Sequence, residues 1–178
     1  MEALLIIDML NDFVRGKFGF PGARRIVPTL RTLLEGWREG GKPVVYVCDS
    51  HPPDDPEFGL WGPHAIKGTE GARVIPELEP KEGERVVEKR RYSGFFGTNL
   101  QEVLEGVGAE GVVLTGVLTE VCVLHTAADA FFRGYRVTVV RDAVSSPSQK
   151  AHHWALKYMK KIYGARVTSS FKLLRERK

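Results

Sequence analysis

The sequence predicts an α/β fold, arranged as a three-layer α/β/α sandwich around a mostly parallel, doubly wound central sheet. Short runs rich in β-branched residues alternate with helical patterns along the whole chain. Two of these runs, at 44–48 and 112–116, are continuously apolar, which is typical of parallel strands that helices cover on both faces. Strands that are connected through helices run parallel, so the alternation itself indicates the sheet.

Each element can be placed from these runs and from hydrophobic periodicity. Helix 24–38 repeats apolar residues at spacings of three and four, and Gly40 and Gly41 mark its end. Before helix 99–107, Thr98 and Gln101 form a capping-box pattern. The predicted order is strand 3–8, helix 24–38, strand 43–48, strand 85–89, helix 99–107, strand 111–116, helix 119–133, strand 135–140, helix 149–162 and strand 165–170.

Length and composition narrow the class of protein. With 178 residues, 43% of them hydrophobic, the chain fits a single domain spanning 1–178. No apolar run approaches the roughly 18 residues of a membrane-spanning helix, and the first residues lack the features of an export signal. Two separate cysteines, Cys48 and Cys122, favour a reducing cytoplasm over a disulfide framework. The net charge of +4 comes largely from Lys160, Lys161 and segment 171–178, without the interleaved aromatic residues of a nucleic-acid-binding surface.

Reactive side chains follow four of the predicted strands. Asp8, Asp49 and Lys89 each end a strand, and the strand at 111–116 leads directly to Cys122. Parallel α/β sheets bind their ligands beyond the carboxyl ends of the strands, where these four residues are expected to meet. An ammonium or a carboxylate at the end of an apolar run is costly unless it is paired, so Lys89 and Asp8 are candidate partners. The alternatives are a solvated charge for Lys89 and a strand cap for Asp8.

Cys122 is the candidate nucleophile. It falls in the first turn of a helix with Thr119 as its expected N-cap, where exposed amides and the helix dipole favour a thiolate. A buried, unreactive cysteine is the alternative, because free cysteines are among the most frequently buried residues. His125 lies one turn further on, so a Cys–His dyad competes with the carboxylate and ammonium, although a packing role suits this histidine better.

The segment from residue 49 to residue 64 carries a candidate metal site. Asp49 and His51 are two residues apart and therefore point to the same side of an extended segment, and His64 returns to the same region. Together they suit a divalent cation, with zinc as the first choice and iron or manganese as alternatives. Acidic and histidine side chains in a proline-rich loop can also be simply solvated.

Three segments, ALLIIDMLNDF, EKRRYSGFFGTNL and LTGVLTEVCVLHTAADAFFRGYRVTVVRDAV, resemble the signature segments of the isochorismatase-like cysteine hydrolases, in particular the nicotinamidase/pyrazinamidase branch. The resemblance runs nearly end to end. It implies a catalytic triad of Asp8, Lys89 and Cys122. It also implies a cis peptide between Val117 and Leu118, with the backbone N–H groups of Leu118 and Cys122 forming an oxyanion hole.

The same resemblance implies a metal site and an aromatic pocket. The expected metal ligands are Asp49, His51, Glu57 and His64. The aromatic walls of a flat-ring pocket fall on Phe13, Trp61 and Tyr92, although an aromatic residue near a sheet is often part of the core.

The activity implied is hydrolysis of a small-molecule amide, nicotinamide, to nicotinate and ammonia. The alternatives are another amidohydrolase of the family, with a carbamoyl or maleamate-like substrate, and a non-catalytic metal-binding assembly protein. The family also implies a homo-oligomer, a dimer or tetramer, and neither nucleic acid nor a membrane is an expected partner.

Overall fold

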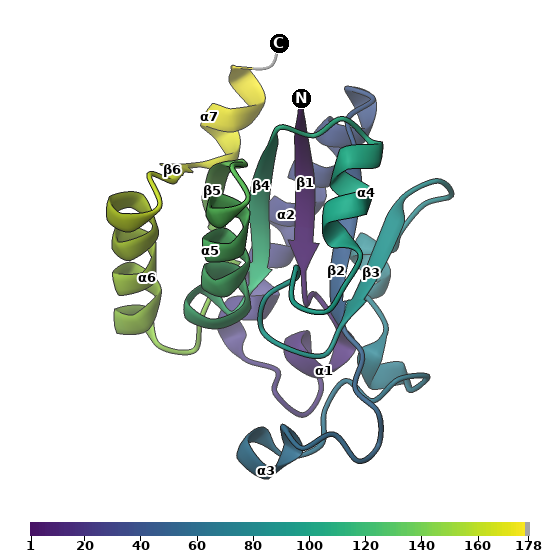
Figure 1. Ribbon diagram of the computed structural model, residues 1–178. Coiled ribbons are helices and arrows are strands. Elements are labelled where there is room, and N and C mark those ends of the chain that lie inside the picture. Colours follow the sequence, from purple (N-terminus) through teal and green to yellow (C-terminus); the bar gives the residue numbers. More distant parts are fainter. Residues whose placement is uncertain (177–178) are drawn as a thin grey trace.

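A single sheet organises the molecule (Figure 1). The computed structural model describes residues 1–176, so the end of the basic segment 171–178 lies outside it. Within residues 1–176, six strands, all parallel, pair in the order β3-β2-β1-β4-β5-β6, which confirms the predicted α/β class. The strands are β1 (Glu2–Ile7), β2 (Val44–Asp49), β3 (Arg85–Lys89), β4 (Gly111–Val117), β5 (Arg136–Ser145) and β6 (Arg166–Thr168).

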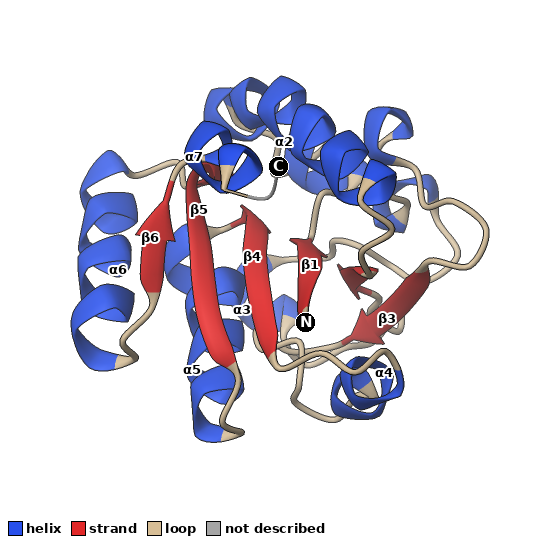
Figure 2. Cartoon of the chain, turned by 90° about the horizontal axis from the view of Figure 1, so that it is seen from above, coloured by secondary structure: helices blue, strands red, loops and turns tan. Residues whose placement is uncertain are grey.

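Helices cover both faces of the sheet, as Figure 2 shows when the molecule is seen from above. The α-helices are α1 (Asn11–Val14), α2 (Pro21–Glu39), α3 (Phe58–Trp61), α4 (Leu100–Gly106), α5 (Leu124–Phe132), α6 (Gln149–Ile162) and α7 (Ser170–Arg175). Two 3₁₀ helices, η1 (Glu70–Ala72) and η2 (Pro76–Leu78), and one π-helical turn, η3 (Thr119–Val123), complete the described part.

Alternate residues of β1, β2, β4 and β5 enter two separate cores. On one face, Leu4 and Ile6 of β1 pack with α2 and with Leu173 of α7. On the other face, Leu5 and Ile7 pack with α4, α5 and α6. This two-sided burial explains the continuous apolar runs in the sequence, and it confirms the predicted three-layer sandwich.

Several boundaries differ from the predictions. Helix α2 begins at Pro21 rather than at residue 24, because proline at the first helical position needs no N–H partner. The predicted helix 119–133 is divided into η3 and α5. The capping box before α4 does not form, since the Thr98 hydroxyl donates to the Gly94 carbonyl and accepts from the Leu100 N–H.

The sheet order places β1 between β2 and β4, so the carboxyl end of β1 is flanked by the ends of its neighbours. Gly116 of β4 allows this close approach: its φ is +102°, and a Cβ atom there would overlap the Ile7 carbonyl. Among the described residues, no helix has both the length and the apolar character that crossing a membrane requires.

Candidate active site

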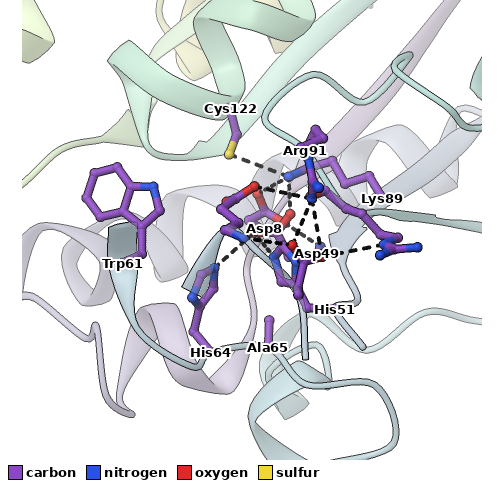
Figure 3. Close-up of polar contacts among 12 residues, drawn as sticks. Asp8, Asp49, His51, Trp61, His64, Ala65, Lys89, Arg91 and Cys122 are labelled. Atoms are coloured by element: carbon purple, nitrogen blue, oxygen red, sulfur yellow. Dashed lines mark hydrogen bonds and ion pairs between the residues drawn. The ribbon is translucent and has the colours of Figure 1, made fainter. Parts of the chain in front are cut away.

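The carboxyl edge of the sheet brings together the residues that the strand ends predicted. Asp8 follows β1, Asp49 ends β2, Lys89 ends β3, and Cys122 lies in the turn after β4. Figure 3 shows their side chains converging from these separate elements. One donor atom each from Asp8, Asp49 and Cys122 lies within 4.8 Å of the other two. Asp8 adopts a left-handed conformation, with φ of 52°, which Asp tolerates better than most residues.

Lys89 connects the three acidic groups. Its Nζ lies 2.9 Å from Asp8 Oδ2, donates a hydrogen bond to Asp49 Oδ1, and lies 3.5 Å from Cys122 Sγ. The ammonium is completely buried, so the two carboxylates are what make its charge tolerable in the interior. Asp8 Oδ1 accepts the Asp49 N–H at 2.7 Å. The predicted pairing of Lys89 with Asp8 is therefore present, and Lys89 is not a solvated charge.

Burial and mutual repulsion alter the acidities of this cluster. Burial raises the pKa of Asp8 to about 6, helped by the Asp49 charge and opposed by Lys89. Burial also raises the pKa of the Cys122 thiol well above its usual value, with Lys89 opposing the shift. The enclosure of the sulfur and the two carboxylates beside it act against the thiolate, in the opposite sense to the helix N-terminus. The thiol needs a base.

The turn that carries Cys122 has the predicted cis peptide bond between Val117 and Leu118. It continues as the π-helical turn η3, in which the Leu118 carbonyl accepts the N–H groups of Val121 and Val123. Thr119 does not cap this turn; its hydroxyl instead contacts His152, so the expected N-cap is wrong. Leu118 and Cys122 both line the central pocket, as an oxyanion hole there requires.

Three of the four predicted metal ligands also converge. Asp49 Oδ2 lies 3.6 Å from His51 Nε2 and 4.0 Å from His64 Nε2. Each histidine uses its Nδ1–H elsewhere: His51 donates to Asp55 Oδ2 at 3.0 Å and His64 to the Gly62 carbonyl at 2.7 Å. His51 Nε2 is buried and has no hydrogen-bond partner among the described residues. An orphaned imidazole nitrogen beside a carboxylate fits a divalent cation, and the opposite hydrogen bonds fix the ring orientations that ligation needs.

Glu57 is placed differently from these three. Its carboxylate forms an ion pair with Arg91 at 3.6 Å, outside the close group formed by Asp49, His51 and His64. Sequence reasoning missed Asp55, whose fully buried carboxylate also accepts the Glu57 N–H and pairs with Arg91. These contacts lower the pKa of Asp55, although its burial acts in the opposite sense. Asp54 precedes it in a loop of acidic and proline residues, so no sequence signal separated the two.

An apolar pocket of about 210 Å³ opens beside the thiol. The predicted Phe13, Trp61 and Tyr92 line it, and Trp61 Nε1–H donates to the Tyr92 hydroxyl at 2.9 Å. Phe18 and Phe20 were not predicted to belong to it, because they precede α2 in an irregular segment without periodicity. Cys122 and His64 line the same pocket, so the thiol and the candidate metal site face one ligand space.

His125 does not form the competing dyad. Its Nδ1–H donates to the Val121 carbonyl at 2.7 Å and its ring packs against Tyr92, with 5.4 Å between ring centroids. The imidazole is exposed on the surface of α5. The base nearest to the thiol is therefore a carboxylate.

Residues 2–170 match the isochorismatase domain, so the chain belongs to the isochorismatase family and is a hydrolase of that family. Among solved structures, it is similar to the N-carbamoylsarcosine amidase of Thermoplasma acidophilum, with 45% identity, a TM-score of 0.89, and coverage of 95% of this chain and 96% of that one. It is likewise similar to the nicotinamidase/pyrazinamidase of Bacillus subtilis, with 38% identity, a TM-score of 0.88, and coverage of 94% and 99%. The pyrazinamidase of Pyrococcus horikoshii, solved in complex with zinc, has 32% identity, a TM-score of 0.87, and coverage of 94% and 98%.

Proposed function

We propose that this protein hydrolyses nicotinamide to nicotinate and ammonia through a thioester on Cys122. The observation that carries the proposal is the composition of the pocket: the thiol and His64 face a space whose other walls are mostly aromatic and aliphatic. Among the described lining residues there is no lysine or arginine. Such a pocket suits a flat, uncharged ring, whereas a substrate with a free carboxylate calls for a basic side chain beside that carboxylate.

In the proposed reaction, Asp8 accepts the Cys122 proton as the sulfur attacks the amide carbon. Apart from its ion pair with Lys89, Asp8 Oδ2 has no hydrogen-bond partner in the described part of the chain, so it is available as the base. The oxyanion receives hydrogen bonds from the Leu118 and Cys122 N–H groups. Asp8 then returns the proton to the amide nitrogen. Ammonia departs, and the acyl group remains on Cys122 as a thioester.

Water completes the cycle. Asp8 removes a proton from water as the water oxygen attacks the thioester carbon, and it passes this proton to the departing sulfur, which restores the thiol. The carboxylic acid that is released ionises to nicotinate. Lys89 keeps its positive charge throughout, since Asp49 and Asp8 surround it and raise its pKa well above the usual value. Asp49, His51 and His64 would hold the metal, with Glu57 as a further candidate ligand. A divalent cation bound there would supply a Lewis acid that fixes the ring nitrogen of the substrate.

Comparison of nicotinamide with benzamide tests this assignment, because benzamide has the same shape but lacks the ring nitrogen. In the wild type, we expect kcat/KM for benzamide to be far lower than kcat/KM for nicotinamide. In His64→Ala, the two values of kcat/KM should be similar. Release of ammonia gives the rates, and elemental analysis gives the metal content. Equal wild-type efficiency with both amides would remove the metal-anchoring part of the proposal.

A second candidate is hydrolysis of an N-carbamoyl amino acid, which the 45% identity with the N-carbamoylsarcosine amidase favours. Separate measurements of kcat/KM for N-carbamoylsarcosine and for nicotinamide, each by ammonia release, decide between them. A non-catalytic metal-binding protein is the remaining alternative. It predicts that iodoacetamide leaves Cys122 unlabelled under conditions in which a catalytic thiol is alkylated.

A further inference from the structure

The start of α6 is bonded to the turn that carries Cys122. Thr119 Oγ1 and His152 Nδ1 lie 2.8 Å apart and share a hydrogen bond. The next residue of the turn, Glu120, accepts a hydrogen bond from Ser146 Oγ at 2.7 Å. Two adjacent residues of η3 are thus held from the same side by the segment from Ser146 to His152, which no step of the proposed reaction uses.

That segment is itself well fixed. Ser146 Oγ accepts the Ser148 N–H at 3.0 Å, and Ser148 Oγ accepts the Ala151 N–H at 3.2 Å as the N-cap of α6. The His152 N–H donates to the Ser148 carbonyl at 2.9 Å. His152, which bonds Thr119, therefore lies in the capped first turn of α6 and not in a loop.

The partner of the half-buried His152 lies deeper in the molecule. Thr119 is fully buried, and it begins a π-helical turn, a rare conformation that occurs frequently at functional sites. Cys122 lies three residues after Thr119 in the same turn. Leu118, whose N–H is the other proposed oxyanion donor, directly precedes Thr119. A shift of the turn would move both the nucleophile and the oxyanion hole.

The ring of His152 is suited to this contact. Burial and the neighbouring His153 hold the pKa of His152 below its usual value, opposed by Glu120. A neutral imidazole has one nitrogen that donates and one that accepts, so it can bond a threonine hydroxyl in either sense. His153, the next residue of α6, differs from His152: it is exposed, and its Nδ1–H donates to the Gln149 carbonyl of its own helix.

We infer that His152 is a positioning residue for amide hydrolysis: through Thr119 it holds the η3 turn so that Cys122 Sγ and the Leu118 N–H stay aligned for attack. This inference rests on the proposed function, since it assigns η3 the nucleophile and the oxyanion hole. His152 touches neither the substrate nor the reacting atoms. Its effect should therefore fall on kcat and leave KM nearly unchanged.

The test uses His152→Ala, His152→Asn and Thr119→Val, with Lys157→Ala, a change at an exposed residue of the same helix, as the control. An asparagine side-chain amide can take the place of Nδ1 and keep the bond to Thr119, whereas alanine cannot. Loss of alignment by about 1 Å can cost on the order of a hundredfold in rate, so we expect His152→Ala and Thr119→Val to lower kcat by about tenfold or more. His152→Asn should restore most of the activity, and Lys157→Ala should match the wild type.

The double variant His152→Ala/Thr119→Val should be no worse than the poorer single variant, because both changes break one hydrogen bond. Alkylation of Cys122 by iodoacetamide, followed by mass spectrometry, gives a second measurement that needs no substrate. We expect it to slow in His152→Ala and Thr119→Val, since a displaced sulfur loses the support of Lys89. Melting temperatures identify any variant that is merely unfolded.

Wild-type kcat and alkylation rate in a folded His152→Ala variant would overturn the inference, and so would additive losses in the double variant. The two proposals can fail separately. If the wild type does not hydrolyse nicotinamide but alkylation follows the predicted order, the assigned substrate is wrong and the role of His152 stands. If nicotinamide is hydrolysed and neither measurement responds to these changes, the role of His152 is wrong.

Discussion

Lys89 is the residue on which the charge balance of the site depends. It is completely buried, and it neutralises two carboxylates that would otherwise repel each other across the ends of β1 and β2. The sequence indicated this role because an ammonium that ends an apolar strand needs an acidic partner. It did not reveal that both Asp8 and Asp49 contact the same ammonium.

Replacement of Lys89 should therefore damage both stability and turnover. In Lys89→Ala, the buried carboxylates lose their counter-charge, and breaking a buried ion pair in this way costs about 3–5 kcal/mol of unfolding free energy. Denaturant unfolding measures this loss. Asp8→Asn/Lys89→Ala should recover part of it, because one of the two uncompensated charges is gone. A fully stable Lys89→Ala variant would mean that the carboxylates become protonated at little cost.

Cys122→Ala should abolish ammonia release and leave the fold intact. The sulfur borders a pocket, so its removal costs at most about 1 kcal/mol of unfolding free energy, whereas the thioester cannot form without it. Cys48→Ala is the control, because Cys48 packs in the core on the opposite face of the sheet. The variants are compared by ammonia release and by thermal unfolding. Comparable losses of turnover in both would show that the effect comes from packing rather than from a nucleophile.

The residues that sequence reasoning missed share a physical cause. Asp8, Asp49, Lys89 and Cys122 could be found because parallel strands end at one edge of the sheet. The positions of Asp55, Phe18 and His152 depend on how loops and helix ends fold back over that edge. A single sequence carries no periodic signal for such contacts.

At the scale of the elements, strand and helix positions followed from periodicity, while their ends followed from local contacts. Val139 and Val140 were placed in a strand, but β5 continues to Ser145 beside the carboxyl end of β4. The predicted caps at Thr98 and Thr119 failed because the Thr98 hydroxyl bonds Gly94 and Leu100, and the Thr119 hydroxyl bonds His152. Capping patterns describe a helix by itself, and packing decides which bond forms.

Helix α2 contains an unfavourable residue at an exposed interior position. Pro28 has no N–H to donate to the Arg24 carbonyl, and proline is about 3 kcal/mol worse than alanine inside a helix. Proline also restricts the unfolded chain, which offsets about 0.4–1 kcal/mol of that difference. We therefore expect Pro28→Ala to raise the unfolding free energy by about 2–2.6 kcal/mol, as measured by denaturant unfolding. Pro21→Ala, at the first helical position, should give no such gain, and an equal gain there would contradict this account.

At the scale of the whole molecule, the candidate metal site joins the sheet to the long segment between β2 and β3. Asp49 ends β2, whereas the buried His64 follows α3, a short helix that lies beyond the carboxyl edge of the sheet (Figure 1). The bonds that hold this loop include those from Arg91 to Asp55 and from Ala65 N–H to Asp12. A cation shared by Asp49, His51 and His64 would add a link that the unfolded chain cannot form.

Metal binding should therefore stabilise the entire fold and not only support turnover. A ligand that binds only the folded state at a hundred times its Kd contributes about 2.7 kcal/mol, so added Zn²⁺, Mn²⁺ or Fe²⁺ should raise the melting temperature of chelator-treated protein. His51→Ala and His64→Ala should lose this rise, and His125→Ala, an exposed histidine outside the site, should keep it. Asp55→Asn should give an intermediate rise in melting temperature, because it weakens the support of His51 without removing a ligand. Such changes lower metal affinity by about 10- to 100-fold.

Thermal unfolding across a metal titration gives the affinities without any substrate, and the metal that gives the largest shift at equal concentration is the preferred one. If His51→Ala and His64→Ala keep the full rise in melting temperature, the cation binds elsewhere, and Asp49, His51 and His64 are a hydrogen-bonded cluster rather than a metal site.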